Sequence, residues 1–360
     1  MPSIFVTLKK FYFSKVIVVS KVIIQMFYIL DGILKFVKIK IILFIILCIV
    51  LLVGCENNNN NVEKNIKENT LKDIQKEVVV DRESKIPADA VKITTVTDVN
   101  PPKSHSAEYN DPVPMPYPIN TAGAEDSPFM LADGNTFYFF FTPDVRIPAE
   151  KQLLDGVTGI WVSKKVNNEW SKPERVVLQD SKKLALDGCE FVSGNNMLFC
   201  SAREGYSGIH WFSAELVNGK WQNWKNVDFN SNYKVGELHI FNDELYFHSE
   251  KTGGKGGLDI WMSKKINGEW TEPVNIESVN SANSEGWPAL NPTGTELWFY
   301  KDYSIWRSKK INGEWTAPEL MFSSLAGEPT IDNSGNVYFT HHFYKDNKML
   351  EADIYVAKKK

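Results

Sequence analysis

The stretch Ile260–Pro273 reads IWMSKKINGEWTEP, and the chain repeats it several times. Close copies run over Ile305–Pro318 and Ile160–Pro173, and a more divergent copy spans His210–Trp221. The copies recur every 45 to 51 residues or so, which is about the period of propeller and solenoid repeats. The repeat therefore predicts a fold assembled from equivalent units.

Each copy has the chemistry of a β-hairpin. An Asn-Gly or Asn-Asn pair stands at its centre, and these residues accept the positive φ angles of a type I′ turn. Aromatic and β-branched residues such as Trp261 precede the turn and suit a strand. Proline has no amide hydrogen for a ladder, so Pro173, Pro273 and Pro318 predict that the second strand lies at a sheet edge.

A second hairpin precedes each of these copies. This hairpin is recognised by a polar turn followed by a short aromatic segment. The aromatic segment occurs five times, at Phe137–Phe139, Leu198–Phe199, Leu245–Phe247, Leu297–Phe299 and Val337–Phe339. Two hairpins in series make four antiparallel strands. Five such units predict an all-β fold, a five-bladed β-propeller of four-stranded antiparallel blades.

The fifth unit has only three strands, the last at Asp353–Val356. When the units are aligned, Asp111–Ile119 falls where a fourth strand belongs, and its alternating prolines suit an outermost strand. We therefore expect Asp111–Ile119 to pair with Asp353–Ala357 and to close the ring. Closure would also remove an exposed sheet edge, which is an aggregation hazard.

Residues 1–54 have the layout of a secretory signal. Ile41–Val53 is a continuous apolar run that follows three lysines, and a start at Met26 would give the signal an ordinary length. The ending Leu52-Val53-Gly54-Cys55 resembles the lipobox of bacterial lipoproteins. The resemblance implies lipidation of Cys55 and a lipid anchor in a membrane of the bacterial cell envelope. A plain transmembrane anchor is the alternative.

Residues 55–108 are polar and begin with a run of asparagines at Asn57–Asn61. Such a composition buries too little apolar surface to offset chain entropy, so it predicts a flexible tether before a propeller at 109–360. The formal net charge of −4 lacks the basic excess that nucleic-acid binding uses. We expect no nucleic-acid partner, no cofactor and no metal.

Two cysteines fall inside the predicted propeller. Cys189 and Cys200 lie at equal distances from the Gly194-Asn195 turn, so they are expected to be cross-strand neighbours. A disulfide is chemically allowed in an exported protein. Two buried free thiols are the alternative.

The stretch Phe247–Ser263, FHSEKTGGKGGLDIWMS, resembles the TolB-type, WD-like β-propeller repeats of bacterial envelope proteins. The resemblance covers about Asp111–Lys360, nearly all of the predicted folded part. It implies a propeller that serves as a binding or scaffold module for an envelope protein or a glycan. Such repeats support many functions, so the residues of the site must decide among them.

Acidic residues stand at or near the start of the first strand in every unit: Glu125, Asp126, Asp187, Glu190, Glu237, Glu285 and Glu328. Loops expected on the same face of the propeller add Arg146, Arg203 and His341. A ring of carboxylates permits acid–base catalysis, cation binding or sugar recognition. The alternative is architectural, with each acid accepting hydrogen bonds from the backbone or pairing with a lysine.

Five-bladed propellers include arabinanase- and xylosidase-type glycosidases, and Asp126-Ser127-Pro128 resembles their first acidic site. Hydrolysis needs two carboxylates, so the catalytic candidates are Asp126, Asp187 and Glu237. The main prediction is a membrane-anchored binding module, and a glycoside hydrolase is the alternative. Convergent acids beside an open pocket would favour the enzyme, and a plugged channel would favour the scaffold.

Overall fold

The computed structural model describes residues 81–360 except 181, 230 and 231. The predicted signal, Cys55 and the first part of the predicted tether lie outside this range. Helix within it is limited to the 3₁₀ turn η1 (Arg82–Lys85) and the short α3 (Ala149–Gln152). Neither is long and apolar enough to cross a membrane.

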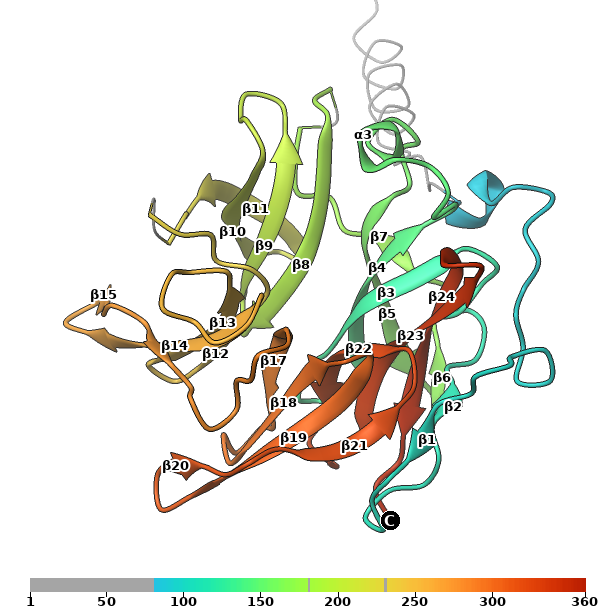
Figure 1. Ribbon diagram of the computed structural model, residues 1–360. Helices are drawn as coiled ribbons and strands as arrows, with labels where there is room; N and C mark the ends of the chain where they lie inside the picture. The colour runs from blue at the N-terminus through green and yellow to red at the C-terminus, as the bar shows by residue number, and fades with distance from the viewer. Residues whose placement is uncertain (1–80, 181, 230–231) are drawn as a thin grey trace, which may run out of the picture. The chain divides into compact units, whose positions relative to one another are not determined.

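The described residues form five antiparallel blades around a centre (Figure 1), which confirms the predicted propeller. Blade 1 contains β3 (Ala124–Met130), β4 (Thr136–Thr142), β5 (Gly159–Val166), β6 (Glu169–Trp170) and β7 (Glu174–Arg175). Blade 2 contains β8 (Ala185–Ser193), β9 (Asn196–Arg203), β10 (Ile209–Val217) and β11 (Lys220–Asn226). Blade 3 contains β12 (Leu238–Phe241), β13 (Glu244–Ser249), β14 (Asp259–Ile266), β15 (Glu269–Trp270) and β16 (Val274–Asn275).

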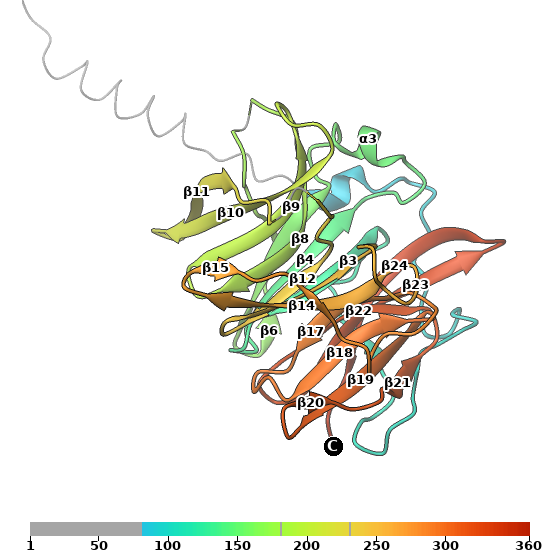
Figure 2. The same ribbon diagram turned by 60° about the vertical axis from the view of Figure 1, so that its left-hand side comes forward.

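Blade 4 contains β17 (Glu285–Leu290), β18 (Glu296–Lys301), β19 (Ser304–Ile311), β20 (Glu314–Trp315) and β21 (Glu319–Ser323). Blade 5 contains β22 (Ala326–Ile331), β23 (Val337–Lys345), β24 (Lys348–Ala357) and the N-terminal β2 (Val113–Pro114). The first strands of the blades contact one another around the centre, and later strands lie farther out (Figure 2).

The repeated hairpin has the predicted turn. Asn267 and Gly268 have φ angles of 53° and 88°, and the corresponding pair Asn312 and Gly313 has 51° and 89°. The strand after the turn is interrupted: β15 ends at Trp270, and β16 begins directly after Pro273. The proline thus lies between two short outer strands, where no ladder hydrogen bond is needed from its nitrogen.

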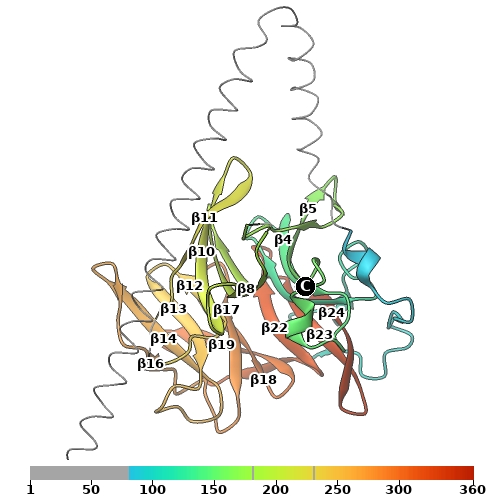
Figure 3. The same ribbon diagram turned by 90° about the horizontal axis from the view of Figure 1, so that it is seen from above.

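The ring closes as the sequence predicts. Val113 pairs with Val356 and Pro114 with Tyr355, and the Met115 amide donates to the Ile354 carbonyl at 2.8 Å. Blade 5 therefore takes its fourth strand from the N-terminal part of the propeller, beside blade 1 (Figure 3). The prolines in this segment are compatible with its outermost position.

Part of the segment predicted as a tether, residues 55–108, contacts the propeller. Arg82 is buried against blade 1, and Lys92 forms ion pairs with Glu351 and Asp353 of blade 5. The two-residue β1 (Lys103–Ser104) adds a strand to β21 of blade 4. The polar composition of this segment led to the prediction of a flexible tether. Composition alone does not show that Arg82 and Lys92 pair with buried acids far away in the sequence.

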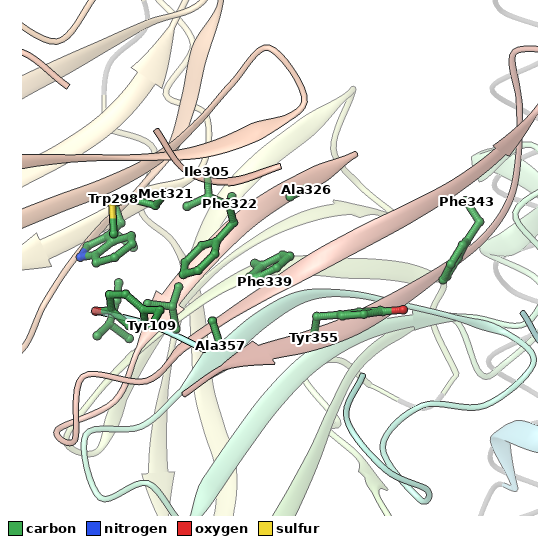
Figure 4. Packing of buried hydrophobic residues seen from close by; sticks show 13 residues of the cluster. Tyr109, Trp298, Ile305, Met321, Phe322, Ala326, Phe339, Phe343, Tyr355 and Ala357 are labelled. Atoms are coloured by element: carbon green, nitrogen blue, oxygen red, sulfur yellow. The ribbon is translucent and has the colours of Figure 1, made fainter. Parts of the chain in front are cut away.

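The hydrophobic core is divided among the contacts between neighbouring blades. Figure 4 shows the cluster between blades 4 and 5, where Phe322 stacks on Trp298 and Phe339. Tyr109, from the segment before the closing strand, packs edge-on against Trp298 and Phe322. Similar clusters join the other pairs of neighbouring blades, so packing fixes the ring that surrounds the central channel.

Candidate functional site

The first strands contain irregularities that direct side chains toward the central channel. The pairing of β3 with β4 shifts between Asp126 and Phe129, and equivalent shifts occur in β8, β17 and β22. One residue of each bulge has a positive φ angle: Ser127, Cys189, Trp287 and Glu328. A bulge reorients the side chains of its strand, and all four of these residues line the channel.

The channel encloses a cavity of about 40 Å³. This volume suits one or two water-sized groups and is too small for a sugar ring. Its lining includes Glu190, Glu237, Glu328 and Trp287. Asp126 lies beside Ser127, and its side chain is 30% exposed. Acids from blades 1, 2, 3 and 5 therefore converge at this channel.

Three of the predicted acids lie elsewhere, in buried ion pairs: Glu125, Asp187 and Glu285. Their respective partners are Arg82, Arg203 and Lys301, at N···O distances of 3.1, 2.7 and 3.1 Å. The Glu125 and Glu285 carboxylates also accept hydrogen bonds from the backbone four residues upstream. These three acids support the architecture of the blades. Asp187 is therefore not placed to act as a catalytic group in the channel.

Asp126 and Glu328 meet at the junction of blades 1 and 5. Glu328 accepts hydrogen bonds from the Ser127 amide and hydroxyl at 2.8 and 2.7 Å. Burial, reinforced by the charge of Asp126, raises the pKa of Glu328 well above its usual value. Burial by itself would raise the pKa of Asp126. The charge of His342 and a hydrogen bond with Glu328 act in the opposite direction, and the net effect is a lowered pKa of Asp126. Asp126 is thus the ionised member of this pair.

Burial and the charge of Asp126 raise the pKa of Glu237 to about 8. Burial also raises the pKa of Glu190 well above its usual value. Both carboxyl oxygens of Glu190 are buried without a hydrogen-bond partner, and so is the indole nitrogen of Trp287. The Trp287 indole is near enough to Glu237 to oppose the rise in its pKa, yet it lacks hydrogen-bond geometry. The channel therefore holds protonated acids beside an ionised one at neutral pH.

A row of aromatic rings leads outward from the channel. His248 packs on Trp287 with ring centroids 4.9 Å apart, Trp287 packs on Tyr300 at 5.1 Å, and Tyr300 on Tyr303 at 6.0 Å. Tyr303 is 57% exposed, so the row reaches solvent. Burial lowers the pKa of His248 to about 4, and the neutral ring accepts a hydrogen bond from the Trp287 amide at Nδ1.

The other predicted ligand-binding residues do not line the channel cavity. Arg146 is at the surface, where it pairs with Asp144 and Asp89. Arg203 pairs with Asp187 and lies 4.1 Å from the centroid of the Phe212 ring. His341 is fully buried and is 3.2 Å from Asp98 of the N-terminal segment.

Cys189 and Cys200 form a disulfide with Cα atoms 5.4 Å apart. The simple hairpin register places these residues directly opposite each other, but the bulge pairs Cys200 with Gly188. Cys189 instead occupies the bulge, with a φ angle of 54°, and lines the channel. The extra residue of a bulge explains this one-residue difference.

Sequence reasoning did not select Trp287, Tyr300 or Tyr303 for the site. The sequence does contain one further signal for Asp126. The residue before the bulge is glycine in blades 2, 4 and 5, but it is aspartate in blade 1. Asp126 thus departs from a repeated small residue. No group of three histidine, cysteine or acidic residues in the described part of the chain is arranged to hold a metal ion.

No protein-family model matches the sequence, and no curated protein shows significant similarity to it. Among solved structures, the chain is similar to the Bacteroides ovatus Xyloglucan PUL GH43B, with 13% identity, a TM-score of 0.41 and coverage of 68% of this chain and 54% of that chain. It is also similar to an endo-arabinase from Bacteroides thetaiotaomicron, with 12% identity, a TM-score of 0.43 and coverage of 68% and 96%. A putative TolB from Agrobacterium tumefaciens is 12% identical, with a TM-score of 0.33 and coverage of 67% and 92%.

Proposed function

We propose that the propeller is a glycoside hydrolase that acts at the mouth of its central channel. The observation that carries this proposal is the convergence of Asp126 and Glu237 at one channel, where their surroundings shift their pKa values in opposite directions. Glycoside hydrolysis uses one carboxylate as base or nucleophile and one carboxylic acid as proton donor. Pairs of acids whose environments separate their pKa values are candidates for these two roles.

Asp126 is the carboxylate in this scheme. Its side chain is 30% exposed, so it can contact a water molecule or a sugar carbon outside the cavity. His342, 4.0 Å away, favours its charged form. Glu237 is the proton donor, because burial keeps its carboxyl group protonated at neutral pH.

The aromatic row supplies a surface for the sugar. Because the cavity of about 40 Å³ cannot hold a ring, the sugar would lie outside it, against Trp287, Tyr300 and Tyr303. Tryptophan and tyrosine side chains combine an apolar ring with a polar N–H or O–H group, which suits contact with a sugar at the protein surface. Only a substituent of the sugar would enter the channel.

The test is turnover of a glycan panel by the full chain and by two isosteric variants, Asp126→Asn and Glu237→Gln. Loss of one acid–base group usually costs about 10²- to 10⁴-fold in rate. Glu204→Gln, in an exposed turn, is the matched control and should retain full activity. Absence of turnover of every glycan by the unaltered chain would refute the hydrolase.

Binding without catalysis is the second candidate, and the size of the cavity favours it. Typical small-molecule pockets measure about 300 to 1,000 Å³, far more than this channel. A glycan could then lie on the aromatic row without any bond cleavage. Retention on an immobilised glycan, lost in Tyr303→Ala and accompanied by no turnover, would identify this function.

We further propose that Cys55 anchors the protein to a bacterial envelope membrane through a lipid. The support is the sequence Leu52-Val53-Gly54-Cys55 behind a basic and apolar leader. Metabolic labelling with a radioactive fatty acid should mark the unaltered chain and fail to mark Cys55→Ser. Equal labelling of both proteins would exclude Cys55 as the lipid site.

A further inference from the structure

Glu190, Glu237 and Glu328 of the channel differ from Glu125, Asp187 and Glu285 in their surroundings. Glu125, Asp187 and Glu285 each contact an arginine or lysine, and Lys92 serves Glu351 and Asp353. Within the described residues, no lysine or arginine forms an ion pair with Glu190, Glu237 or Glu328. Burial of a charged acid without a counter-charge is costly, so these three carboxyl groups need either a proton or a cationic occupant.

Polar atoms in the cavity are also left without partners. Glu190 is only 6% exposed and lines the cavity, yet neither of its carboxyl oxygens has a hydrogen bond. A buried polar group that stays unsatisfied is destabilising. These atoms indicate a site that an occupant completes.

The charges around the cavity identify the kind of occupant. The lining contains neither lysine nor arginine, and His239, which does line it, is neutral because burial lowers its pKa to about 4. Arg175 acts on Glu190 only through space, and its guanidinium already donates to three backbone carbonyls. The field in the cavity is therefore set by carboxyl groups.

The size of the cavity and its hydrogen-bonding groups narrow the choice further. The cavity accepts a group the size of water, and the acids around it can offer several acceptor oxygens. A primary ammonium group has this size and carries three N–H donors.

We propose that the channel binds the primary ammonium group of an amino sugar. This inference rests on the proposed glycan function and names its substrate class: the ring would lie on the aromatic row while its free amine enters the cavity. Glu190 would ionise against the ammonium group and release its proton to solvent, while Glu237 keeps the proton that hydrolysis needs. An N-acetylated sugar, which is neutral and bulkier at this position, would be rejected.

The experiment is calorimetric titration of the full chain with methylammonium, glucosamine, glucose and N-acetylglucosamine. We expect the two amines to bind and the two neutral sugars not to bind. The heat of binding should change with the ionisation enthalpy of the buffer, because binding releases protons.

Glu190→Gln is the discriminating variant. Glutamine resembles the protonated acid of the empty site, so folding should be retained, but it cannot ionise. Its amine affinity should fall at least about tenfold, the equivalent of one charged hydrogen bond, while Glu204→Gln binds normally.

The outcomes distinguish failure of the ammonium site from failure of the proposed hydrolase activity. Equal binding of glucosamine and glucose, or no amine binding at about 10 mM, would overturn the ammonium site, since usual KM values lie below that concentration. Turnover of neutral glycans could still support hydrolysis. Amine binding that depends on Glu190, without turnover of any glycan, would support the ammonium site and refute the hydrolase.

Discussion

The Arg82 guanidinium donates a hydrogen bond to the Glu125 carboxylate at 3.1 Å, and both side chains are almost fully buried. The contact spans 43 residues and joins the N-terminal segment to the first strand of blade 1. Blades 2 and 4 carry their own cations for the corresponding acids, Arg203 and Lys301. Phe141 lies opposite Glu125 in blade 1, where blade 4 has Lys301 opposite Glu285, so the cation for Glu125 comes from upstream of the propeller.

Arg82→Met should therefore destabilise the fold strongly. Breaking a buried ion pair from one side leaves an uncompensated charge and costs about 3 to 5 kcal/mol. Urea unfolding of the full chain measures this change. Adding Glu125→Gln to the variant should recover part of the loss, because it removes the unpaired charge.

The control for this prediction is Arg146→Met, which removes the pairs of an exposed arginine with Asp89 and Asp144. Exposed ion pairs contribute little to stability, so its unfolding curve should stay close to that of the unaltered chain. Equal stability of the Arg82 and Arg146 variants would contradict the role assigned to the N-terminal segment.

Glu237→Gln should make the protein more stable at high pH. The folded state holds the pKa of Glu237 at about 8, above the ordinary value of 4.5, so it binds a proton that the unfolded chain releases. The stability that this proton contributes is complete below about pH 4.5 and is lost as the pH rises to about 8. Glutamine does not titrate, so the variant's excess free energy of unfolding over the unaltered chain should grow across this pH window and then stay constant.

Urea unfolding at about pH 5, 7 and 9 tests this prediction, because the linkage acts only between the two pKa values. Glu204→Gln, in its exposed turn, should show no such divergence from the unaltered chain. A Glu237→Gln advantage that shrinks as the pH rises would have the wrong sign.

Hydrolysis, if it follows the proposed roles, should have a bell-shaped pH profile. Activity requires ionised Asp126 and protonated Glu237, so kcat/KM should fall above about pH 8. Glu237→Gln should lose the upper limb and retain turnover of aryl glycosides whose leaving group needs no proton. A profile that still rises beyond pH 8 would exclude Glu237 as the acid.

Deleting residues 110–120 should lower Tm sharply, because the deletion removes the closing strand of blade 5. A finer test is Asn120→Ala. The side-chain amide of Asn120 donates to the backbone carbonyl of Ile354 at 2.9 Å. Its oxygen accepts from the backbone N–H of Ile354 at 3.1 Å. Loss of these buried bonds should cost about 1 to 3 kcal/mol.

Asn280 provides the matched control, because it makes the same two bonds to Ile260 between blades 3 and 4. The two alanine variants should lose comparable stability in thermal unfolding. An unchanged Tm after the deletion, or after Asn120→Ala alone, would mean that the ring does not depend on this closure.

The sequence predicts most of the fold because the relevant signals are local. Asn267-Gly268 specifies its turn through backbone conformation, and Pro273 limits its strand to an edge through a missing donor. The closing strand at Asp111–Ile119 could be found because repeats supply an internal template. Arg82 and Lys92 gave no comparable signal, since their partners lie far away in the sequence.

The candidate site was predictable only in part. Acids near the starts of the first strands could be recognised, but the sequence treats Asp126, Asp187 and Glu237 alike. The structure separates them: Asp187 pairs with Arg203, whereas Asp126 and Glu237 influence each other across the channel. Glu190 takes the channel position in blade 2 after a bulge that alternation along a strand does not anticipate.

The sequence by itself determined the number of blades, their hairpins and the strand that closes the ring, because turn and strand preferences act between near neighbours in the chain. Only the tertiary structure decided which acids are neutralised and which remain unpaired in the channel. That distinction depends on burial and on charges brought together from different blades, and neither quantity is a property of any single segment.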